Sequence, residues 1–390
     1  MTKRFKTTAR TLETVKKYDY IIAGAGCAGY SLLYHLLKDP ILCRKKILVV
    51  DSNFEKGNDR TWCFWEDAEG SFDSIVCKKW SKIEVLKDGM HRSLPTYPFE
   101  YKMIQGIDFY QYISNFAKGF EHIDWVAAKI LQIKDQTPNG AAVSWEGGSA
   151  FADYVFSSIN GERIQSALWQ HFKGIVVEFD SPVFDDTIAR LMDFNVSQMD
   201  ATAFMYLLPM SDKKALVEYT LFSPSILKVA QYDEVLNAYM ESHYKGRNYK
   251  IAHTEIGAIP MTTKRLSANT GAVISIGTMG GAVKASTGYA FQFIQQQTRQ
   301  LVQQLKLKQS LNPLVHFTRH HFYDAVLLFI LEHKKMSGDE IFARIFKKND
   351  AATIFRFLSN TSSLLEDIRI MSSLPTSIFL PAAIKVLFRR

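Results

Sequence analysis

A glycine-rich segment near the start of the chain constrains its fold more than any other feature. Tyr18–Ala23 is a short apolar run typical of a buried strand, and it is followed at once by Gly24, Gly26 and Gly29 in the spacing GxGxxG. Cys27–Leu37 then carries apolar residues on one helical face. This order predicts the first βα unit of a doubly wound sheet, with a turn suited to binding phosphate.

Each part of this segment has a physical role in holding a dinucleotide. Gly24 permits the tight turn, Gly26 lets the backbone approach a pyrophosphate, and Gly29 allows the helix to pack closely on the strand. The start of the helix, at Cys27 and Ala28, offers unpaired N–H groups and a positive dipole end to the phosphates. The segment therefore predicts a dinucleotide site, although it does not separate FAD from NAD.

An acidic residue completes the pattern. The apolar strand predicted at Lys46–Val50 ends on Asp51, which lies 22 positions after Gly29. A carboxylate at this distance can accept hydrogen bonds from ribose hydroxyls. Because it also disfavours a 2′-phosphate, Asp51 argues against NADP as the nucleotide bound here.

Changes of pattern along the chain predict a split nucleotide domain. Residues 1–17 are polar and basic and are expected to form a flexible extension, whereas 18–80 and 246–312 carry the pattern of the nucleotide domain. Residues 81–245 show short strands and loops typical of a β-rich substrate domain, and the strand at 153–160 can return to the nucleotide domain. We therefore expect an α/β, Rossmann-like fold of the two-dinucleotide flavoprotein type, with an inserted β-rich domain and C-terminal helices.

Residues 313–390 are predicted to form amphipathic helices that face substrate or membrane. Ile341–Phe346 and Ile354–Leu358 carry apolar residues at helical spacing. The apolar faces can pack on the body of the protein, which we favour for most of the stretch, or dip into a membrane to collect a lipid. Ile384–Arg390 best suits the second role.

Composition limits the classes of function. The net charge of +8 is spread along the chain without a nucleic-acid motif, which leaves a solvated basic surface or attraction to anionic lipid and predicts no nucleic-acid partner. The four cysteines form no CxxC pair and match no metal site, as expected of reduced thiols in a cytosolic protein. We find no signal peptide and no apolar run near the roughly 20 residues that span a bilayer.

Two further segments resemble signature motifs of bacterial lycopene β-cyclases. Asn58–Trp65 (NDRTWCFW) resembles the motif after the second strand in this family, and Gly277–Gly281 (GTMGG) with Ser286–Phe291 (STGYAF) resembles its second flavin-side motif. The likeness covers nearly the whole chain, and the resemblance implies that the dinucleotide is FAD. The residues that it adds to the expected FAD site are Arg60, Gly277, Gly280 and Gly281.

The resemblance also indicates a catalytic strand. Leu216–Thr220 matches the family's Phe-x-Glu-Glu-Thr motif, with its first Glu and its Thr present as Glu218 and Thr220 and its second Glu replaced by Tyr219. In a strand, Glu218 shares one face with apolar neighbours, so that face is either the solvent edge of a hairpin or a buried wall carrying an acid. The resemblance favours the buried acid, and it leaves Glu218 as the single candidate.

Membership of this family implies a cyclisation without net oxidation or reduction, with reduced FAD and with NAD(P)H as reductant. A linear carotenoid such as lycopene would be protonated, and the resulting cation would close to a β-ring. Glu218 is the expected general acid, or it tunes a proton shared with the reduced flavin, and Thr220 belongs to the same catalytic strand. Trp62 and Trp65 either line the pocket and stabilise the cation or are ordinary aromatic core. Glu255 is a weaker second acid, or a surface residue at a strand start.

Two other functions fit the same sequence. A flavin-dependent monooxygenase or dehydrogenase of another apolar lipid would share the fold and the FAD, and a carotenoid-binding flavoprotein without catalysis would share the apolar site. The ring formed, β or ε, and the number of ends closed stay open. We expect a cytoplasmic protein bound peripherally to the inner face of the cell membrane.

Overall fold

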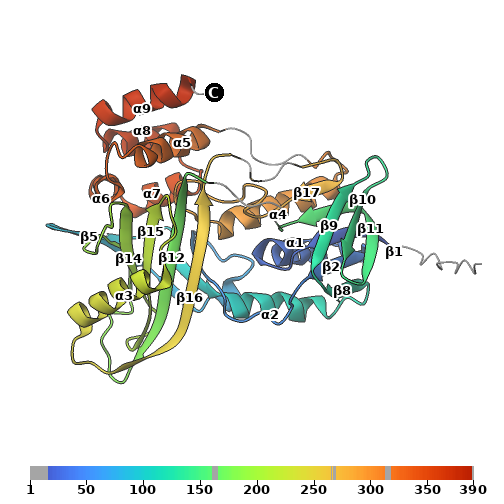
Figure 1. Ribbon diagram of the computed structural model, residues 1–390, viewed down its shortest axis with the longest axis horizontal. Helices are drawn as coiled ribbons and strands as arrows, with labels where there is room; N and C mark the ends of the chain where they lie inside the picture. The colour runs from blue at the N-terminus through green and yellow to red at the C-terminus, as the bar shows by residue number, and fades with distance from the viewer. Residues whose placement is uncertain (1–15, 160–165, 265, 267–268, 312–317, 389–390) are drawn as a thin grey trace, which may run out of the picture.

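The computed structural model describes residues 16–159, 166–264, 266, 269–311 and 318–388, and two large sheets organise this part of the chain (Figure 1). The first sheet has the order β8-β2-β1-β11-β10-β9, with β17 paired to β11. β1 runs parallel to β2 and to β11, which gives the doubly wound core, whereas β9 and β10 form an antiparallel extension. Its strands are β1 (Lys16–Ala23), β2 (Ile47–Asp51), β8 (Ile123–Ala127), β9 (Ile130–Asp135), β10 (Ala141–Trp145), β11 (Gly148–Ser157) and β17 (Val273–Ser275).

Three helices pack with this sheet: α1 (Cys27–Lys38), α2 (Gly106–Ala117) and α4 (Phe291–Lys306). Leucines of α1 form one apolar cluster with Ile294 and Leu301 of α4. The strand and helix predicted around the GxGxxG segment are confirmed. Helix α4 follows the second motif. Two short 3₁₀ helices, η1 (Leu42–Arg44) and η2 (Asp73–Ile75), lie in the connections.

The second sheet, of order β16-β12-β15-β14-β13-β5-β6, has both faces of its central strands buried. Helix α3 (Val229–Tyr244) covers one face, against Val217 and Tyr219, whereas Leu216 and Phe222 join the core on the opposite face. Figure 1 shows α3 lying along this sheet. The strands are β5 (Lys82–Lys87), β6 (Met90–Pro95), β12 (Leu168–Phe179), β13 (Ile188–Asp193), β14 (Thr202–Pro209), β15 (Lys214–Ser223) and β16 (Tyr249–Met261).

A three-stranded sheet of order β3-β7-β4 connects the two larger ones. Its members are β3 (Thr61–Glu66), β4 (Lys78–Trp80) and β7 (Glu100–Gln105). Lys102 of β7 is fully buried, and its ammonium group binds Glu66 and Asp73. Because a buried ammonium needs such partners, these contacts fix β7 against the connections around it.

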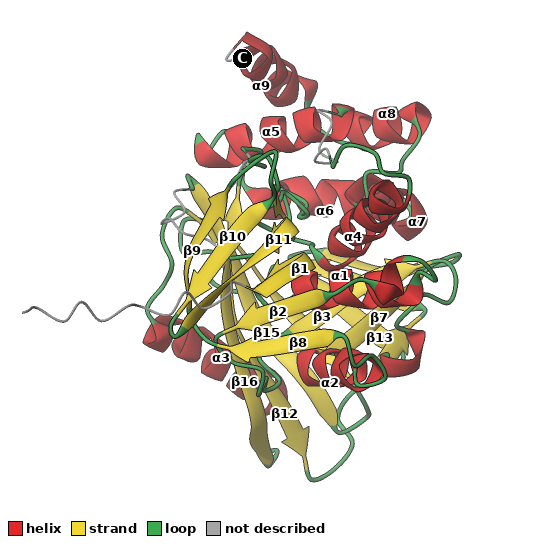
Figure 2. Cartoon of the chain, turned by 90° about the vertical axis from the view of Figure 1, so that its right-hand side faces the viewer, coloured by secondary structure: helices red, strands yellow, loops and turns green. Residues whose placement is uncertain are grey.

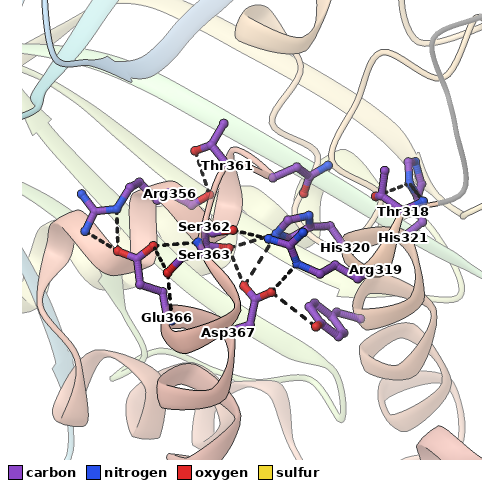
Figure 3. A network of polar contacts seen from close by, with 12 residues as sticks. Thr318, Arg319, His320, His321, Arg356, Thr361, Ser362, Ser363, Glu366 and Asp367 are labelled. Carbon is purple, nitrogen blue, oxygen red and sulfur yellow. Dashed lines mark hydrogen bonds and ion pairs between the residues drawn. The ribbon is translucent and has the colours of Figure 1, made fainter.

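In the described part of the C-terminal region the chain forms helices α5 to α9, and α8 and α9 lie at the outer end of the molecule in both views (Figures 1 and 2). Asp367 of α8 is buried and accepts hydrogen bonds from Ser362, from Arg319 at 2.6 Å and from Tyr323 (Figure 3). These charge-assisted bonds tie α8 to α5. The helices are α5 (Arg319–Glu332), α6 (Gly338–Lys348), α7 (Ala351–Leu358), α8 (Leu364–Ser372) and α9 (Thr376–Phe388).

The predicted basic extension, residues 1–17, lies outside the described residues as far as position 15. Lys16 and Lys17 are instead the first residues of β1, because they continue its parallel pairing with β11. Among the described helices, none is both long enough and apolar enough to cross a bilayer.

Candidate active site

The GxGxxG segment forms an open cradle at the start of α1. Gly24 has a φ of +99°, which the tight turn requires, and Gly26 is the N-cap of the helix. A Cβ atom on Gly29 would lie 1.9 Å from the carbonyl oxygen of Gly24, whereas one on Gly26 would meet no atom within 4 Å. Gly29 therefore provides the close packing, and Gly26 the open backbone, that the GxGxxG spacing predicts.

Asp51 ends β2 beside this cradle. Its Oδ2 accepts a hydrogen bond from the Ala25 N–H at 2.6 Å, and its Oδ1 lies 3.0 Å from the ammonium of Lys56. The carboxylate thus sits against the glycine turn, where a ribose of a nucleotide on the cradle would lie.

The second motif packs directly against the first. Gly277 has a φ of +64°, and a Cβ atom on it would lie 2.7 Å from the Cβ of Ala28. Gly280 approaches the carbonyl oxygen of Ser275, and Gly281 also has a positive φ. These glycines bring two segments from opposite ends of the nucleotide domain into contact.

A cavity of about 550 Å³ extends from this junction to the second sheet. Gly24, Gly29, Asp51, Gly280 and Gly281 lie outside its lining and shape the surrounding turns. The predicted site residues that line it are Gly26, Cys27, Ala28, Arg60, Trp62, Gly277 and Glu218.

Glu218 projects into the cavity from β15 and is 9 % exposed. The alternative that its face is a solvent edge is wrong, because Leu216 and Phe222 on the same face belong to the core. Thr220, fully buried, donates a hydrogen bond of 2.8 Å to Glu218 Oε1. Burial, followed by the charge of Glu255, raises the pKa of Glu218 well above its usual range.

Tyr219 faces the other way. Its ring packs on the α3 side of the sheet, and its hydroxyl donates a hydrogen bond to the Ser197 carbonyl. Since successive side chains of a strand alternate between faces, any residue at this position points away from the cavity. The replacement of the family's second Glu by Tyr219 therefore removes no group from the cavity.

Glu255 lines the same cavity from β16 and is 5 % exposed. Its Oε2 accepts a hydrogen bond of 2.8 Å from Thr61 at the start of β3. The alternative that Glu255 is a surface residue is wrong, since its side chain is buried, and this burial raises the pKa of its carboxyl.

The two predicted tryptophans differ in position. Trp62 lines the cavity and packs edge-on against Phe109. Trp65 does not line it: its ring stacks on Phe355 with centroids 4.5 Å apart, and its N–H donates to Ser359 at 2.7 Å. Trp65 therefore joins β3 to the C-terminal helices.

Sequence reasoning missed Gln170 of β12, and it quoted Thr287 without giving it a role. Both are buried and line the cavity, and Gln170 Oε1 and Thr287 Oγ1 have no hydrogen-bond partner among the described residues. Buried polar atoms of this kind need a partner, and the polar edge of a flavin ring has matching donors and acceptors. The residues present fit a flavin beside the Gly277 turn. No periodic signal could have found Gln170, since a polar residue inside a strand has no distinctive pattern.

A second cavity, of about 270 Å³, lies among the C-terminal helices. Its walls are almost entirely apolar, with Phe342, Phe346 and Phe379 among them, and it shares Thr287 and Tyr289 with the first cavity. The hydroxyl of Tyr289 lies 3.4 Å from that of Tyr206, at the boundary between the two spaces. An apolar chamber thus adjoins the chamber that holds the acids.

Comparison with solved structures shows a fold shared with FAD-dependent oxidoreductases and monooxygenases. A geranylgeranyl bacteriochlorophyll reductase-like protein from Thermoplasma acidophilum is 13% identical, with a TM-score of 0.63 over 96% of this chain and 99% of that one. The p-nitrophenol 4-monooxygenase PnpA from Pseudomonas putida DLL-E4 is 12% identical, with a TM-score of 0.60 over 95% and 98%. An HpxO variant from Klebsiella pneumoniae, complexed with FAD, is 12% identical, with a TM-score of 0.57 over 88% and 98%. At these identities the likeness establishes the predicted flavoprotein fold.

Sequence comparison adds one family. The family model described as lycopene cyclase protein matches residues 19–383. No curated protein matched the chain.

Proposed function

The chain belongs to the lycopene cyclase protein family, and from this premise we propose that it closes the linear end groups of lycopene to β-rings, giving β-carotene by way of γ-carotene. The reaction is an isomerisation: a proton adds to the terminal double bond, the internal double bond attacks the cation, and the ring loses a proton. The observation that carries the proposal is Glu218, a buried carboxyl that opens into the same cavity as the glycine cradle.

Glu218 has the properties of the general acid. Protonating an alkene at neutral pH requires a carboxyl that is still protonated there, and burial favours that neutral form by raising the pKa of Glu218. Because Thr220 donates to Oε1, the acidic proton is left on the other oxygen. The side chain can then present this proton to a double bond in the cavity.

The walls of the cavity suit a carbocation. Trp62, Tyr101, Tyr206 and Tyr289 line it, and aromatic faces attract a cation while they exclude the water that would quench it. The pKa of Tyr206 is raised well above its usual range, mainly by burial, so its ring stays neutral. These side chains would bind the reacting end group of the polyene without forming a covalent bond to its cation.

FAD would be held by the Gly26–Gly29 cradle and the N-terminus of α1, with Asp51 at the ribose and Gly277 and Thr287 at the ring. When bound and reduced, with NAD(P)H as reductant, FAD supplies negative charge near the developing cation. Arg60 is exposed at the rim of the same cavity, where it would be within reach of the cofactor.

The apolar chamber under α5–α9 would admit the polyene. It adjoins the acid-bearing cavity at Tyr289, and its other walls include Met371 of α8 and Leu380 of α9, which are also exposed on the surface. A linear hydrocarbon has no polar group to bind, so a continuous apolar route to Glu218 is what its recognition requires.

We propose that this end of the protein rests on a membrane. Leu364, Ile368 and Met371 recur along one face of α8, and Leu380, Ile384 and Leu387 recur along α9, all of them exposed. Exposed apolar stripes at helical spacing suit the interface of a bilayer. Beside them, Arg369 lies 3.6 Å from Asp350, but its side chain is 64% exposed and can also meet anionic headgroups. The substrate would then pass from the bilayer into the apolar chamber.

The decisive experiment is pigment analysis in a bacterial host that accumulates lycopene. We expect the wild-type chain to replace lycopene with β-carotene or γ-carotene, and Glu218→Gln to reduce cyclisation by about 10²–10⁴-fold while the protein keeps its flavin. Glu241→Gln is the matched control, because that side chain is 69% exposed on α3. Oxygenated carotenoids would indicate a monooxygenase, and unchanged lycopene with flavin-bound protein a carotenoid-binding protein; either result contradicts the proposal.

A further inference from the structure

Glu218 and Glu255 occupy one row across three neighbouring strands. In the pairing of β12 with β15, Gly174 lies opposite Glu218, and in the pairing of β12 with β16 it lies opposite Glu255. Neighbouring strands are about 4.8 Å apart, so the backbones of the two acids are separated by about 10 Å with β12 between them. Two glutamate side chains can meet across such a gap only if nothing fills it.

Gly174 leaves that gap open. A Cβ atom built on it would lie 3.3 Å from Glu218 Cβ and 3.2 Å from Glu255 Cγ, and 2.9 Å from a methyl of Leu216. Any side chain at this position would separate the acids. With glycine there, the two carboxyls face one another across the strand, close enough for the charge of Glu255 to raise the pKa of Glu218.

The two carboxyls have different surroundings. Glu218 lies among apolar and aromatic side chains, and its polar contact apart from Glu255 is Thr220. Glu255 accepts a hydrogen bond from Thr61 and lies near the positive charge of Arg60 and the ring of His253, both of which favour its ionised form. Environments that differ in this way assign opposite protonation states to a carboxyl pair.

We propose that Glu255 is a positioning residue that shares a single proton with Glu218, so that two different strands supply the acid pair of this site. This inference rests on the proposed cyclisation and deepens it. In the resting pair Glu218 carries the proton and Glu255 is the carboxylate.

Such a pair accounts for the proton balance of the reaction. Glu218 gives its proton to the terminal carbon of the substrate, the internal double bond supplies the electron pair of the new C–C bond, and nothing is oxidised or reduced. Two adjacent carboxylates then remain, and because like charges at this distance repel strongly, the pair becomes a better base. The proton that the ring loses returns to it, and the starting state is restored.

Other titratable groups face the pair from each element packed against it. None of them carries a negative charge at neutral pH, because burial raises the pKa of each thiol and phenol: that of Tyr289 reaches about 12, and that of Cys63 lies well above its usual range. The pair therefore titrates as a unit beside an uncharged thiol and uncharged phenols. The groups are Cys63 of β3, Tyr206 of β14, Tyr289 after β17, and Arg60 and His253 next to Glu255.

The test is the pH profile of cyclisation by purified protein with reduced FAD and lycopene in liposomes. The wild-type profile should be bell-shaped, limited on the acid side by protonation of Glu255 and on the alkaline side by ionisation of Glu218. In Glu255→Gln the acid limb should disappear. The alkaline limb should move to lower pH by about one unit or more, because the neighbouring charge no longer raises the pKa of Glu218.

Glu255→Asp keeps the charge but shortens the side chain, and it should restore part of the alkaline limb. A profile of Glu255→Gln that is uniformly lower, with both limbs in place, would mean a structural role and would overturn the inference, as would an unchanged profile. Glu241→Gln should match the wild type at every pH. Absence of cyclisation by the wild type would refute the proposed function itself, which separates the two failures.

Discussion

At the scale of single residues, glycines determine which groups can approach one another in this site. Gly29 is packed against the turn that precedes its own helix, Gly277 against the Ala28 methyl group, and Gly174 lies below two carboxyls. In each place a missing side chain lets two other groups approach. The cofactor cradle and the acid pair therefore depend on positions without a side chain as much as on reactive groups.

Gly29→Ala tests the cradle at this scale. Alanine stabilises a helix more than glycine does, so a loss of FAD affinity in Gly29→Ala cannot come from helix propensity. It must come from the added Cβ atom, which would lie 1.9 Å from the Gly24 carbonyl oxygen. We expect FAD affinity to fall about tenfold or more, since overpacking costs about 1–3 kcal/mol. Flavin fluorescence titration measures this directly.

Gly119→Ala is the matched control, because its Cβ would meet nothing closer than the Phe116 carbonyl oxygen at 3.6 Å. Unchanged FAD affinity in Gly29→Ala would show that the turn can move aside.

At the scale of elements, a buried ion pair holds the C-terminal helices to the loop of the second motif. The Lys284 ammonium lies 2.9 Å from the Asp324 carboxylate of α5 and donates a hydrogen bond of 2.7 Å to Asn360. Ser286 donates to the same carboxylate at 2.7 Å. Since Asp324 also lines the apolar chamber, this pair sets how the chamber wall meets the flavin-side loop.

Lys284→Met should destabilise the protein strongly, because it leaves the Asp324 charge buried without its counter-ion. We expect the free energy of unfolding to fall by about 3–5 kcal/mol in urea denaturation of the FAD-loaded protein. Lys284→Met combined with Asp324→Leu should recover most of the loss. Equal stability of Lys284→Met and the wild type would mean that the pair holds nothing in place.

At the scale of the whole molecule, three features follow one another in space from the interior to the surface. They are the acid pair, the apolar chamber and the exposed stripes of α8 and α9. Helices α8 and α9 lie at the outer end of the molecule, beyond the second sheet (Figure 1). An enzyme for a water-insoluble polyene requires this order, because the substrate must not cross water on its way to the acid.

Replacing Leu365 and Ile368 of α8 with Glu should weaken binding to liposomes that contain anionic lipid. Leu365 is 80% exposed, and each buried leucine-sized side chain contributes about 1.5–3 kcal/mol, or about tenfold in affinity. Co-sedimentation measures the change. Leu131→Glu on β9, where the leucine is 60% exposed, is the control and should bind as the wild type does, because Figure 1 shows β9 well away from α8 and α9. Equal binding by all variants would mean that a surface other than this part of α8 contacts the liposomes.

The local parts of this molecule could be predicted from the sequence. The strand, turn and helix around Gly24–Gly29 and the amphipathic helices after residue 318 follow from periodicity, which depends only on near neighbours. The two-residue period of side chains along a strand also predicts that Glu218 and Thr220 share a face. Which face is buried could not be predicted, because burial depends on what packs against the sheet.

The tertiary structure alone decided the rest. Strand order places β12 between β15 and β16, and this order brings Glu255 to Glu218 across Gly174. Trp62 and Trp65, three positions apart on β3, point to opposite faces of the strand, and only the packing of β3 decides that the face of Trp62 is the one that lines the cavity. The physical reason is that a sequence pattern encodes which side of its own element a residue faces, whereas the partner on that side comes from a distant segment whose position only the packed core determines.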